Sequence, residues 1–387
     1  MEIKKPKSVL KNKSVRIYPT KDQEKILTSW FGMFRWFYNR TIDYTKQHKN
    51  YDFYNVRNNM RTNSKYDIPD WCEHTISPRI ITGAIQDCCK SWKTSFSHKN
   101  LKLINTFDLK YKSKKDLSQS FFLEKSCFTN KGILPTFKLG KIKGVYKRRK
   151  INLEDIKIDH DCRLTCQNNK YYIHIPTDVF QDENQVFGSI ISLDSGVRTF
   201  QTGYSIDNHT VELGVNCIDE FKTNLKNIDS CISFASNCGK KRKRLLFNKV
   251  KRINLKIRNK IDDLHWKTIK YLTSNYEYVI ISDFQTQQLL KTKLNSKSKR
   301  MLCILRHYNF KQRLKYKSQI TGTKVHFVDE SYTSKTCCSC GVLNHNLGSN
   351  KTFKCGDCGL KIDRDINGAR NILNKNWEVL STELHVG

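Results

Sequence analysis

Residues 187–206 read FGSIISLDSGVRTFQTGYSI, and this stretch decides the fold of the chain. An apolar run ends at Asp194, Ser195-Gly196 follows as a turn, and a second run begins near Thr199. The pattern predicts two strands joined by a tight connection, and TVELGV (210–215) predicts a third. A carboxylate at the end of a buried strand is costly unless it meets a cation or caps the following turn. Asp194 is therefore the first candidate site residue.

Alternating helices and strands are expected beyond this three-strand meander. A long helix is predicted over 240–272, with apolar residues at steps of three and four and Lys or Arg on the other face. YEYVIISDF (276–284) and KVHFVDE (324–330) predict further strands, with a helix over 299–319 between them. This order is that of an RNase H-like α/β core, which as a fold analogy carries no function alone.

The first 185 residues predict a binding scaffold, because nothing in them has catalytic spacing. Apolar periodicity predicts helices over 23–44 and 79–96. Alternating runs such as ILPTFKL (133–139) and KYYIHIP (170–176) predict strands of a half-buried sheet.

Charge points to a polyanionic partner. The 387 residues include 70 Lys and Arg against 36 Asp and Glu, a net charge of +34. Nucleic acid fits such an excess best, because each neutralised phosphate releases a condensed counterion. No apolar run is long enough to cross a bilayer and the N-terminal residues lack the apolar segment of a signal peptide. We therefore expect an intracellular protein whose fifteen cysteines are thiols or metal ligands.

Four of the cysteines have metal-binding spacing. Cys337-x2-Cys340 and Cys355-x2-Cys358 form two CxxC knuckles separated by fourteen residues. Four thiolates suit one tetrahedral Zn²⁺ in a closed structural site. Cys338 could compete, but Cys337 gives the two-residue gap to Cys340. Gly341, Gly356 and Gly359 permit the tight turns of the knuckles.

Two further acids complete a candidate catalytic cluster with Asp194. Glu330 ends the strand KVHFVDE, and Asp365 lies in DRDINGARNIL (363–373), where a helix begins. Singly, Glu330 suits a solvated surface, and Asp365 suits a helix N-terminus. Together the three acids can converge at one edge of a sheet and bind Mg²⁺. Two such ions about 3.5–4 Å apart would promote phosphodiester hydrolysis, with Asp194 bridging them.

The ordered motifs LDSG (193–196), TSKTCCSCG (333–341), CGDCG (355–359) and DRDINGARNIL resemble the transposon-encoded TnpB proteins and their eukaryotic relatives, the Fanzor nucleases. RIYPTKDQEKILTSWFGMFRWFYN (16–39) is similar to that family's opening motif, whereas 97–185 match loosely. The resemblance implies an α/β RuvC nuclease domain over 186–335 and 361–387, with a zinc ribbon inserted at 336–360. It also implies an N-terminal lobe of mixed barrel and helices over 1–185 that binds nucleic acid.

The activity that the resemblance implies is RNA-guided cutting of DNA. Such proteins use a guide RNA from their own element, read a short motif beside the double-stranded target, and cut with Mg²⁺ at an Asp-Glu-Asp centre. Asp194 and Asp365 match the first and last acids. We expect a monomer within a ribonucleoprotein that does not bind membranes.

The middle acid departs from the TnpB pattern, because Ser282 in IISDF stands where the Glu of that family lies. Three interpretations remain open. Glu330 replaces it, as in Fanzor proteins, which carry a relocated Glu just before the ribbon; Asp283 reaches in, although the pleat sends it to the opposite face from residue 282; or the nuclease is inactive. The relocated acid favours the compact, TnpB-like Fanzor class.

Candidate nucleic-acid contacts lie on the basic face of the 240–272 helix, which equally suits a solvated face. They are Lys240, Lys241, Arg242, Lys243, Arg244, Lys251 and Arg252. The runs KKPK near residue 4 and KKRKR at 240–244 resemble nuclear localisation signals, so the nucleus is the expected compartment. Two alternatives to a guided nuclease are a catalytically silent nucleic-acid-binding protein of the same fold and a transposase acting directly on element ends.

Overall fold

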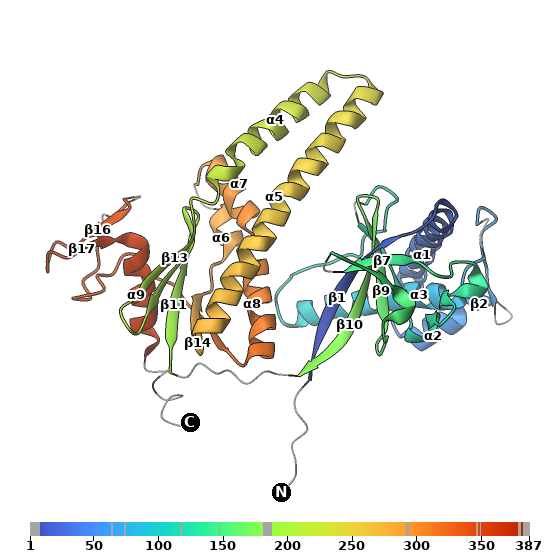
Figure 1. Ribbon diagram of the computed structural model, residues 1–387, viewed down its shortest axis with the longest axis horizontal. Helices are drawn as coiled ribbons and strands as arrows, with labels where there is room; N and C mark the ends of the chain where they lie inside the picture. The colour runs from blue at the N-terminus through green and yellow to red at the C-terminus, as the bar shows by residue number, and fades with distance from the viewer. Residues whose placement is uncertain are drawn as a thin grey trace, which may run out of the picture. The chain divides into compact units, whose positions relative to one another are not determined.

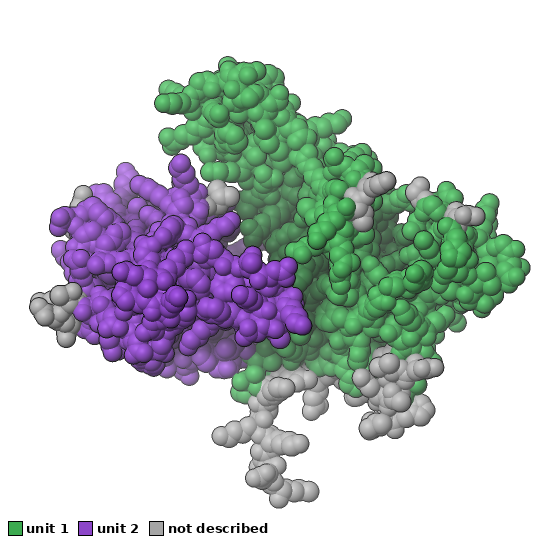
Figure 2. Space-filling view, turned by 180° about the vertical axis from the view of Figure 1, so that it is seen from behind, with its two compact units in different colours: residues 1–9, 180–387 green, residues 10–179 purple. Residues whose placement is uncertain are grey.

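The computed structural model describes residues 8–377 and 381, apart from 63–64, 73–74, 117, 147, 181–187, 292–293, 346 and 349. The chain divides into two compact units, one of residues 10–179 and one of residues 1–9 and 180–387, coloured separately in Figure 2. The boundary predicted at 185 and the KKPK run lie outside the described residues. Within the described part of the chain, no helix is both long and apolar enough to span a bilayer.

The unit of residues 10–179 packs helices against a six-stranded sheet. The strand order is β4-β9-β10-β1-β7-β8. Its strands are β1 (Ser8–Tyr18), β4 (Ser118–Leu123), β7 (Lys143–Tyr146), β8 (Arg149–Asn152), β9 (Cys162–Gln167) and β10 (Lys170–Phe180). Strands β4 and β8 stand at the two ends of this order, and the barrel that the resemblance implies stays a prediction.

The described residues of this unit form three α-helices, two of which were predicted. They are α1 (Lys21–His48), α2 (Phe53–Asn59) and α3 (Pro78–Asn100). Helix α1 begins at a capping box formed by Thr20 and Gln23, and α3 has Pro78 in its first turn. Large aromatic side chains of α1, among them Trp30 and Phe34, are buried in the core beside Phe121. Small two-stranded pairs complete the unit: β2 (Arg61–Thr62) with β3 (Lys65–Tyr66), and β5 (Phe128–Thr129) with β6 (Gly132–Ile133).

The strand predicted over ILPTFKL is wrong. Only its first residue belongs to a strand, β6, and Pro135–Phe137 form a 3-10 turn. Leu134 has a φ of 41° in the left-handed region, and proline at 135 has no N–H to donate to a ladder. The chain therefore turns where alternation alone predicted an extended run.

The other unit contains the predicted meander followed by two parallel strands (Figure 1). The strand order is β13-β12-β11-β14-β15. The strands are β11 (Ile190–Ser195), β12 (Thr199–Ser205), β13 (Thr210–Val215), β14 (Tyr278–Ser282) and β15 (Lys324–Val328). Strand β11 is antiparallel to β12 and parallel to β14, which is itself parallel to β15. The carboxyl ends of β11, β14 and β15 therefore lie at one edge of the sheet.

Helices cover both faces of this sheet. On one face, α4 (Lys222–Ser236), α5 (Lys240–Asn275), α7 (Ser296–Leu305) and α8 (His307–Thr321) share an apolar core with Leu193 and Ile281. On the other face, α9 (Arg364–Lys375) packs through Ala369 and Ile372 against Ile190 and Ile280. The helical hairpin of α4 and α5 extends beyond the sheet in Figure 1. Because residues alternate between faces along each strand, the two helical layers meet different side chains of β11 and β14.

The helix predicted over 299–319 is two helices in the structure. Helix α7 ends at Leu305 and α8 begins at His307, because Arg306 adopts a left-handed φ of 53° between them. The Arg306 guanidinium donates a hydrogen bond of 3.0 Å to Asp262 of α5, which holds the bend in place. Short α6 (Thr286–Lys291) precedes α7.

Candidate metal centres

The four predicted cysteines come together. Their sulphur atoms all lie within 4.8 Å of one another, with Cys337 Sγ 3.6 Å from Cys358 Sγ and Cys340 Sγ 3.5 Å from Cys355 Sγ. Four thiolates at Zn–S distances of about 2.3 Å in a tetrahedron would place sulphurs about 3.8 Å apart. Backbone N–H groups of Cys358 and Asp357 lower the pKa of Cys355 to about 7, which favours its thiolate. The residues therefore fit a zinc ion.

Two glycines and a short hairpin shape this cysteine cluster. Gly341 and Gly359 have φ values of 79° and 74°, which glycine adopts at no steric cost, whereas Gly356 does not require a positive φ. The hairpin consists of β16 (Thr352–Lys354) and β17 (Lys361–Asp363). Cys338 does not join the cluster.

Two asparagines of α9 attach this ribbon to the helix. The Asn367 side chain donates to Thr336 O at 2.7 Å and accepts from the Cys338 N–H at 3.0 Å. One turn later, Asn371 donates to the carbonyl oxygens of Thr333 and Thr336 at 2.8 and 2.7 Å. Both side chains are buried. The spacing Asn-x3-Asn in DRDINGARNIL thus couples the ribbon to the helix that carries Asp365, a role that the sequence analysis missed.

Asp194 lies near the carboxyl end of β11 on the α9 face of the sheet. Its residue keeps some exposed surface, but protein atoms surround the carboxyl group. This burial raises the pKa of Asp194 well above its usual range, and the nearby carboxylates of Asp365 and Glu330 raise it further. Arg364 opposes the shift without cancelling it. Asp365 and Glu330 are therefore both close enough to Asp194 to act on it electrostatically.

Gly368 leaves the space that the Asp194 carboxylate occupies. A Cβ atom at residue 368 would lie 2.6 Å from Asp194 Oδ2, well inside van der Waals contact. The helix approaches this closely because Ser192 of β11 donates a hydrogen bond of 2.7 Å to Ala369 O. The glycine in DRDINGARNIL is thus required for close approach of α9 to the acid, and a sequence alone does not show what it faces.

Asp365 is placed for a role other than capping. The N-cap of α9 is Asp363, whose carboxylate accepts the Asp365 N–H at 2.8 Å. Burial raises the pKa of Asp365, and Asp363 adds to the shift, while Arg364, Arg198 and Lys351 oppose it. The helix-capping acid of α9 is therefore Asp363 and not Asp365.

Glu330 and Ser282 face the same side of the sheet as Asp194. Ser282 pairs with Val328 across β14 and β15, and Glu330 lies two residues beyond Val328. Burial raises the pKa of Glu330, and the Ser282 side chain and Lys311 oppose that shift. The Ser282 hydroxyl is buried, is close enough to the Glu330 carboxyl to affect it, and makes no hydrogen bond of good geometry among the described residues. Glu330 thus occupies the space beside the residue where the TnpB pattern has its acid.

Asp283 points to the opposite face. Its carboxylate pairs with Lys311 of α8, and this ammonium group lowers the pKa of Asp283 through a side-chain hydrogen bond. Its backbone N–H donates to Val328 O at 2.7 Å, as part of the strand ladder. Asp283 therefore already has a cation as its partner.

The acidic cluster differs from the cysteine cluster in spacing. In the described part of the chain, only the four cysteines bring three or more metal-ligand atoms within 4.8 Å of one another. Three carboxylates repel at short range, and a magnesium site keeps waters and substrate phosphate among its ligands. The carboxylate oxygens come from three segments of the chain and fit such an ion in chemical type, with Arg364 close to both Asp194 and Asp365.

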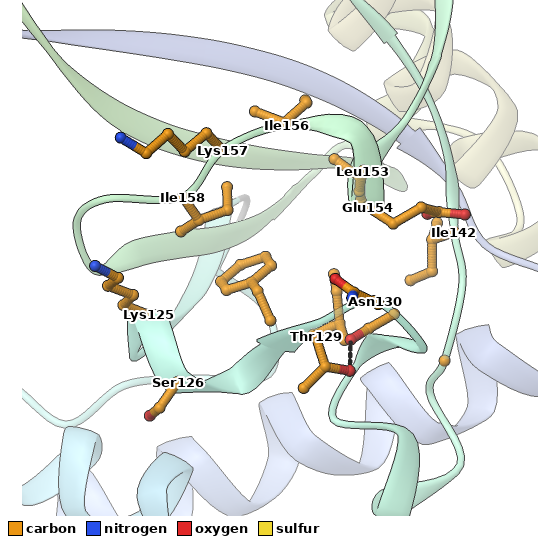
Figure 3. A pocket seen from close by; sticks show the side chains of 14 residues that line it. Lys125, Ser126, Thr129, Asn130, Ile142, Leu153, Glu154, Ile156, Lys157 and Ile158 are labelled. Atoms are coloured by element: carbon orange, nitrogen blue, oxygen red, sulfur yellow. Dashed lines mark hydrogen bonds between the residues drawn. The ribbon is translucent and has the colours of Figure 1, made fainter.

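The predicted basic contacts are all on the exposed surface of the outer half of α5. Residues 240–244, 251 and 252 are exposed, as nucleic-acid binding and simple solvation both require. The 10–179 unit has a pocket of about 400 Å³ with an apolar lining that includes Ile142, Leu153 and Ile156. Figure 3 shows Lys125 and Lys157 on one side of this pocket.

The chain is similar in sequence to known proteins over most of its length. Residues 307–372 match the model "Cas12f1-like, TNB domain", and residues 8–51 match a "Helix-turn-helix domain" model. In this structure residues 8–51 form strand β1 and helix α1. The chain is 30% identical over 401 residues to a protein of Paramecium bursaria Chlorella virus 1 described as a candidate transposase, covering 97% of this chain and 88% of the relative.

Two more relatives and one solved structure extend the comparison. A TnpB-like protein of Acanthamoeba polyphaga mimivirus is 29% identical over 95% of this chain and 74% of its own length. A candidate RNA-guided DNA endonuclease of Escherichia coli is 28% identical over 55% of each chain. The structure of the mini-RNA-guided endonuclease CRISPR-Cas phi3 superposes with a TM-score of 0.51 at 9% identity, covering 95% of this chain and 92% of that one, which shows the fold alone.

The protein is thus of the mixed α/β class seen in Cas12-type proteins, with a cysteine cluster suited to zinc. More particularly, the chain belongs to the TnpB-like family.

Proposed function

We propose that this protein is an RNA-guided DNA endonuclease of a transposon-associated element, with its phosphodiester-hydrolysing centre at Asp194, Glu330 and Asp365. The observation that carries the proposal is the placement of the Asp194 carboxyl at the end of β11, enclosed against Gly368 of α9 and within electrostatic reach of both other acids. Such a cluster destabilises the fold unless a cation compensates it. The name of the Escherichia coli relative supports the reaction class.

Each acid would hold divalent metal from a different segment. Asp194 at the end of β11 is the most enclosed of the three and would hold the metal together with Glu330 and Asp365. Bound Mg²⁺ would supply Lewis-acid stabilisation of the scissile phosphate and of the attacking water. Ser282 would orient the Glu330 carboxylate by donating a hydrogen bond from its hydroxyl group. The proposed centre would be of the RuvC class, with the relocated acid of the Fanzor branch. We also propose that the protein is located in the nucleus.

The remaining surfaces would hold nucleic acid. The exposed cations of α5 would contact phosphates of the guide RNA or target DNA, since proteins of this kind hold the heteroduplex by its backbone and leave sequence reading to base pairing. The cysteine cluster would hold one structural Zn²⁺ and fix the ribbon against α9.

Guide-directed cutting tests the proposal. The protein is purified with its copurifying RNA, the RNA is sequenced, and its guide segment is rewritten to match a plasmid that carries a randomised flanking sequence. With Mg²⁺, the wild type should cut the plasmid that matches the new guide, and Asp194→Asn should bind the RNA without cutting. Asp329→Asn is the matched control, because Asp329 is an exposed acid beside Glu330 that pairs with Lys375.

Two outcomes would contradict the proposal. RNA binding with no cutting by the wild type on any flanking sequence would make this a silent binding protein. Cutting that ignores the rewritten guide would favour a transposase that reads element ends directly.

A further inference from the structure

A cleft beside the N-terminal half of α1 combines an exposed indole with several cations. Its volume is about 630 Å³, and it is lined by one face of α1 together with Trp71, Lys114 and Tyr171. All of these residues belong to the 10–179 unit. Trp71 is 51% exposed, whereas Trp30 and Phe34 of the α1 motif are buried in the core. Trp71 therefore offers an aromatic surface that the fold leaves uncovered.

One contact places the Trp71 ring directly, and two more attach residues that follow it to α1. A Cβ atom at Gly32 would lie 3.3 Å from the Trp71 ring, so the indole packs directly on the backbone of α1. The next residue, Cys72, lies 3.5 Å from the Ser29 hydroxyl. Further along, the Trp30 indole donates to Thr75 O at 3.2 Å. The ring is thus preorganised rather than loosely attached, which lowers the entropic cost of binding a partner against it.

Positive charge surrounds this ring. Lys21, Lys25, Arg35 and Lys114 line the cleft together with the carboxylate of Glu24, and Lys25 also forms an exposed pair with Asp22 at 3.4 Å. Arg35 donates to the Gln119 side chain, and Gln119 donates to Lys114 O at 3.2 Å, so two of the cationic residues are tied to one another through Gln119. Burial lowers the pKa of Arg35. The cleft therefore pairs a flat apolar platform with an anion-attracting rim.

We propose that this cleft binds an unpaired nucleotide, with its base stacked on Trp71 and its flanking phosphates at Lys21, Lys25 and Lys114. Stacking on an aromatic ring accepts any base, while cations track the backbone. This inference rests on the proposed function in one respect only, which is that the bound strand comes from the guide RNA or the target DNA. Guide RNA and displaced DNA share this chemistry, and the test below separates them.

Binding of short oligomers tests the cleft without requiring cleavage. The probes are a fluorescent 12-nucleotide uridine oligomer, its deoxyuridine counterpart, and an abasic oligomer with the same phosphates. Trp71→Ala should weaken binding of at least one of the first two by about fivefold or more, the low end of base stacking. The same variant should bind the abasic oligomer as the wild type does. Trp71→Phe should keep most of the affinity, which guards against an unfolded variant.

Two matched variants separate stacking from charge. Lys114→Gln should reduce the slope of log affinity against log salt by about 0.7, whereas Trp71→Ala should leave that slope unchanged. Trp266→Ala is the control indole: it is 43% exposed, but the Arg313 guanidinium already covers its ring at 5.4 Å. It should bind all probes like the wild type.

Equal binding of every probe by Trp71→Ala and wild type would overturn the proposal, as would an equal loss on the abasic oligomer. A ribose-only effect assigns the cleft to RNA, and an effect on the deoxy probe alone assigns it to a DNA strand. Because these outcomes do not depend on the acidic centre, a failure here leaves the proposed nuclease reaction intact, and the reverse also holds.

Discussion

Acidic side chains meet different neighbours on the two faces of the five-stranded sheet. On the face of α8, Asp283 is paired with Lys311, and the rest of the surface is an apolar core. On the face of α9, Asp194 lies beside Glu330 and Asp365, and its pKa rises instead of falling. Neighbouring residues of one strand, Ser282 and Asp283, belong to these two environments. The protein thus pairs Asp283 with a cation of its own, whereas Asp194 lies among carboxylates whose effect Arg364 does not cancel.

Removing an acid from the α9 face should have the largest effect. Asp365→Asn should lower the rate of guided cleavage by about a thousandfold or more, equal to about 4 kcal/mol of transition-state stabilisation. Single-turnover cleavage with Mg²⁺ measures it. Asp363→Asn is the matched control, because asparagine caps a helix as well as aspartate does, and it should cleave normally.

Loss of the zinc cluster should loosen the support of α9. Cys337→Ser should reduce bound zinc from one equivalent toward none and lower the melting temperature, because structural zinc contributes folding energy directly. Metal analysis and thermal unfolding measure both quantities. Its neighbour provides the comparison: Cys338→Ser should retain zinc, and equal zinc loss in the two variants would contradict the assigned ligands.

Filling the space beside Asp194 should have a smaller effect. Gly368→Ala would bring a methyl group into the carboxylate, so we expect a destabilisation of about 1–3 kcal/mol and slower cleavage. Denaturant unfolding reports the first and single-turnover cleavage the second. Gly356→Ala, where a Cβ would have nothing within 4 Å, should change neither.

The face of the sheet that α5 and α8 cover should show the smallest effect, a dependence of stability on pH. His265 is buried and its Nε2 is 2.9 Å from Leu305 O; burial lowers the pKa of His265 to about 4. Between pH 6.5 and 5 the unfolded chain therefore binds the proton and the folded chain does not, so stability falls as pH falls. The loss should be about 2 kcal/mol.

Buried His307, whose pKa burial lowers to about 3, has the same effect as His265, and the raised pKa of Asp194 has the opposite one. Urea unfolding therefore compares His265→Gln with its parent, both in the Asp194→Asn background, and the loss due to His265 is the difference between them. An equal fall in stability in the two proteins would show that His265 is not held neutral by its burial.

Sequence patterns predicted the parts of the fold with strong periodicity. Helix α5 and strands β11 to β15 are where they were expected, because apolar steps of three and four or buried runs mark them directly. The break at Arg306 was missed because a left-handed φ in a non-glycine residue has no local signal there. The turn at Leu134 had a signal in Pro135, and the alternation outweighed it.

The sequence predicted some residues of the candidate sites and not others. The cysteine ligands follow from spacing alone, since two CxxC knuckles need only converge. The contribution of Gly368, Asn367 and Asn371 depends on which face of α9 meets β11, which only the packed structure shows. The sequence did not indicate a role for Trp71 either, because its ring packs against Gly32, which is far away in sequence.

The most direct test compares two neighbouring acids on the opposite faces of the sheet. Guided plasmid cleavage is measured with Glu330→Gln and Asp283→Asn, each loaded with the same guide RNA and Mg²⁺. The account predicts that Glu330→Gln abolishes cutting while binding RNA normally, and that Asp283→Asn still cuts. Cutting by Glu330→Gln with loss in Asp283→Asn would contradict the assignment of the centre.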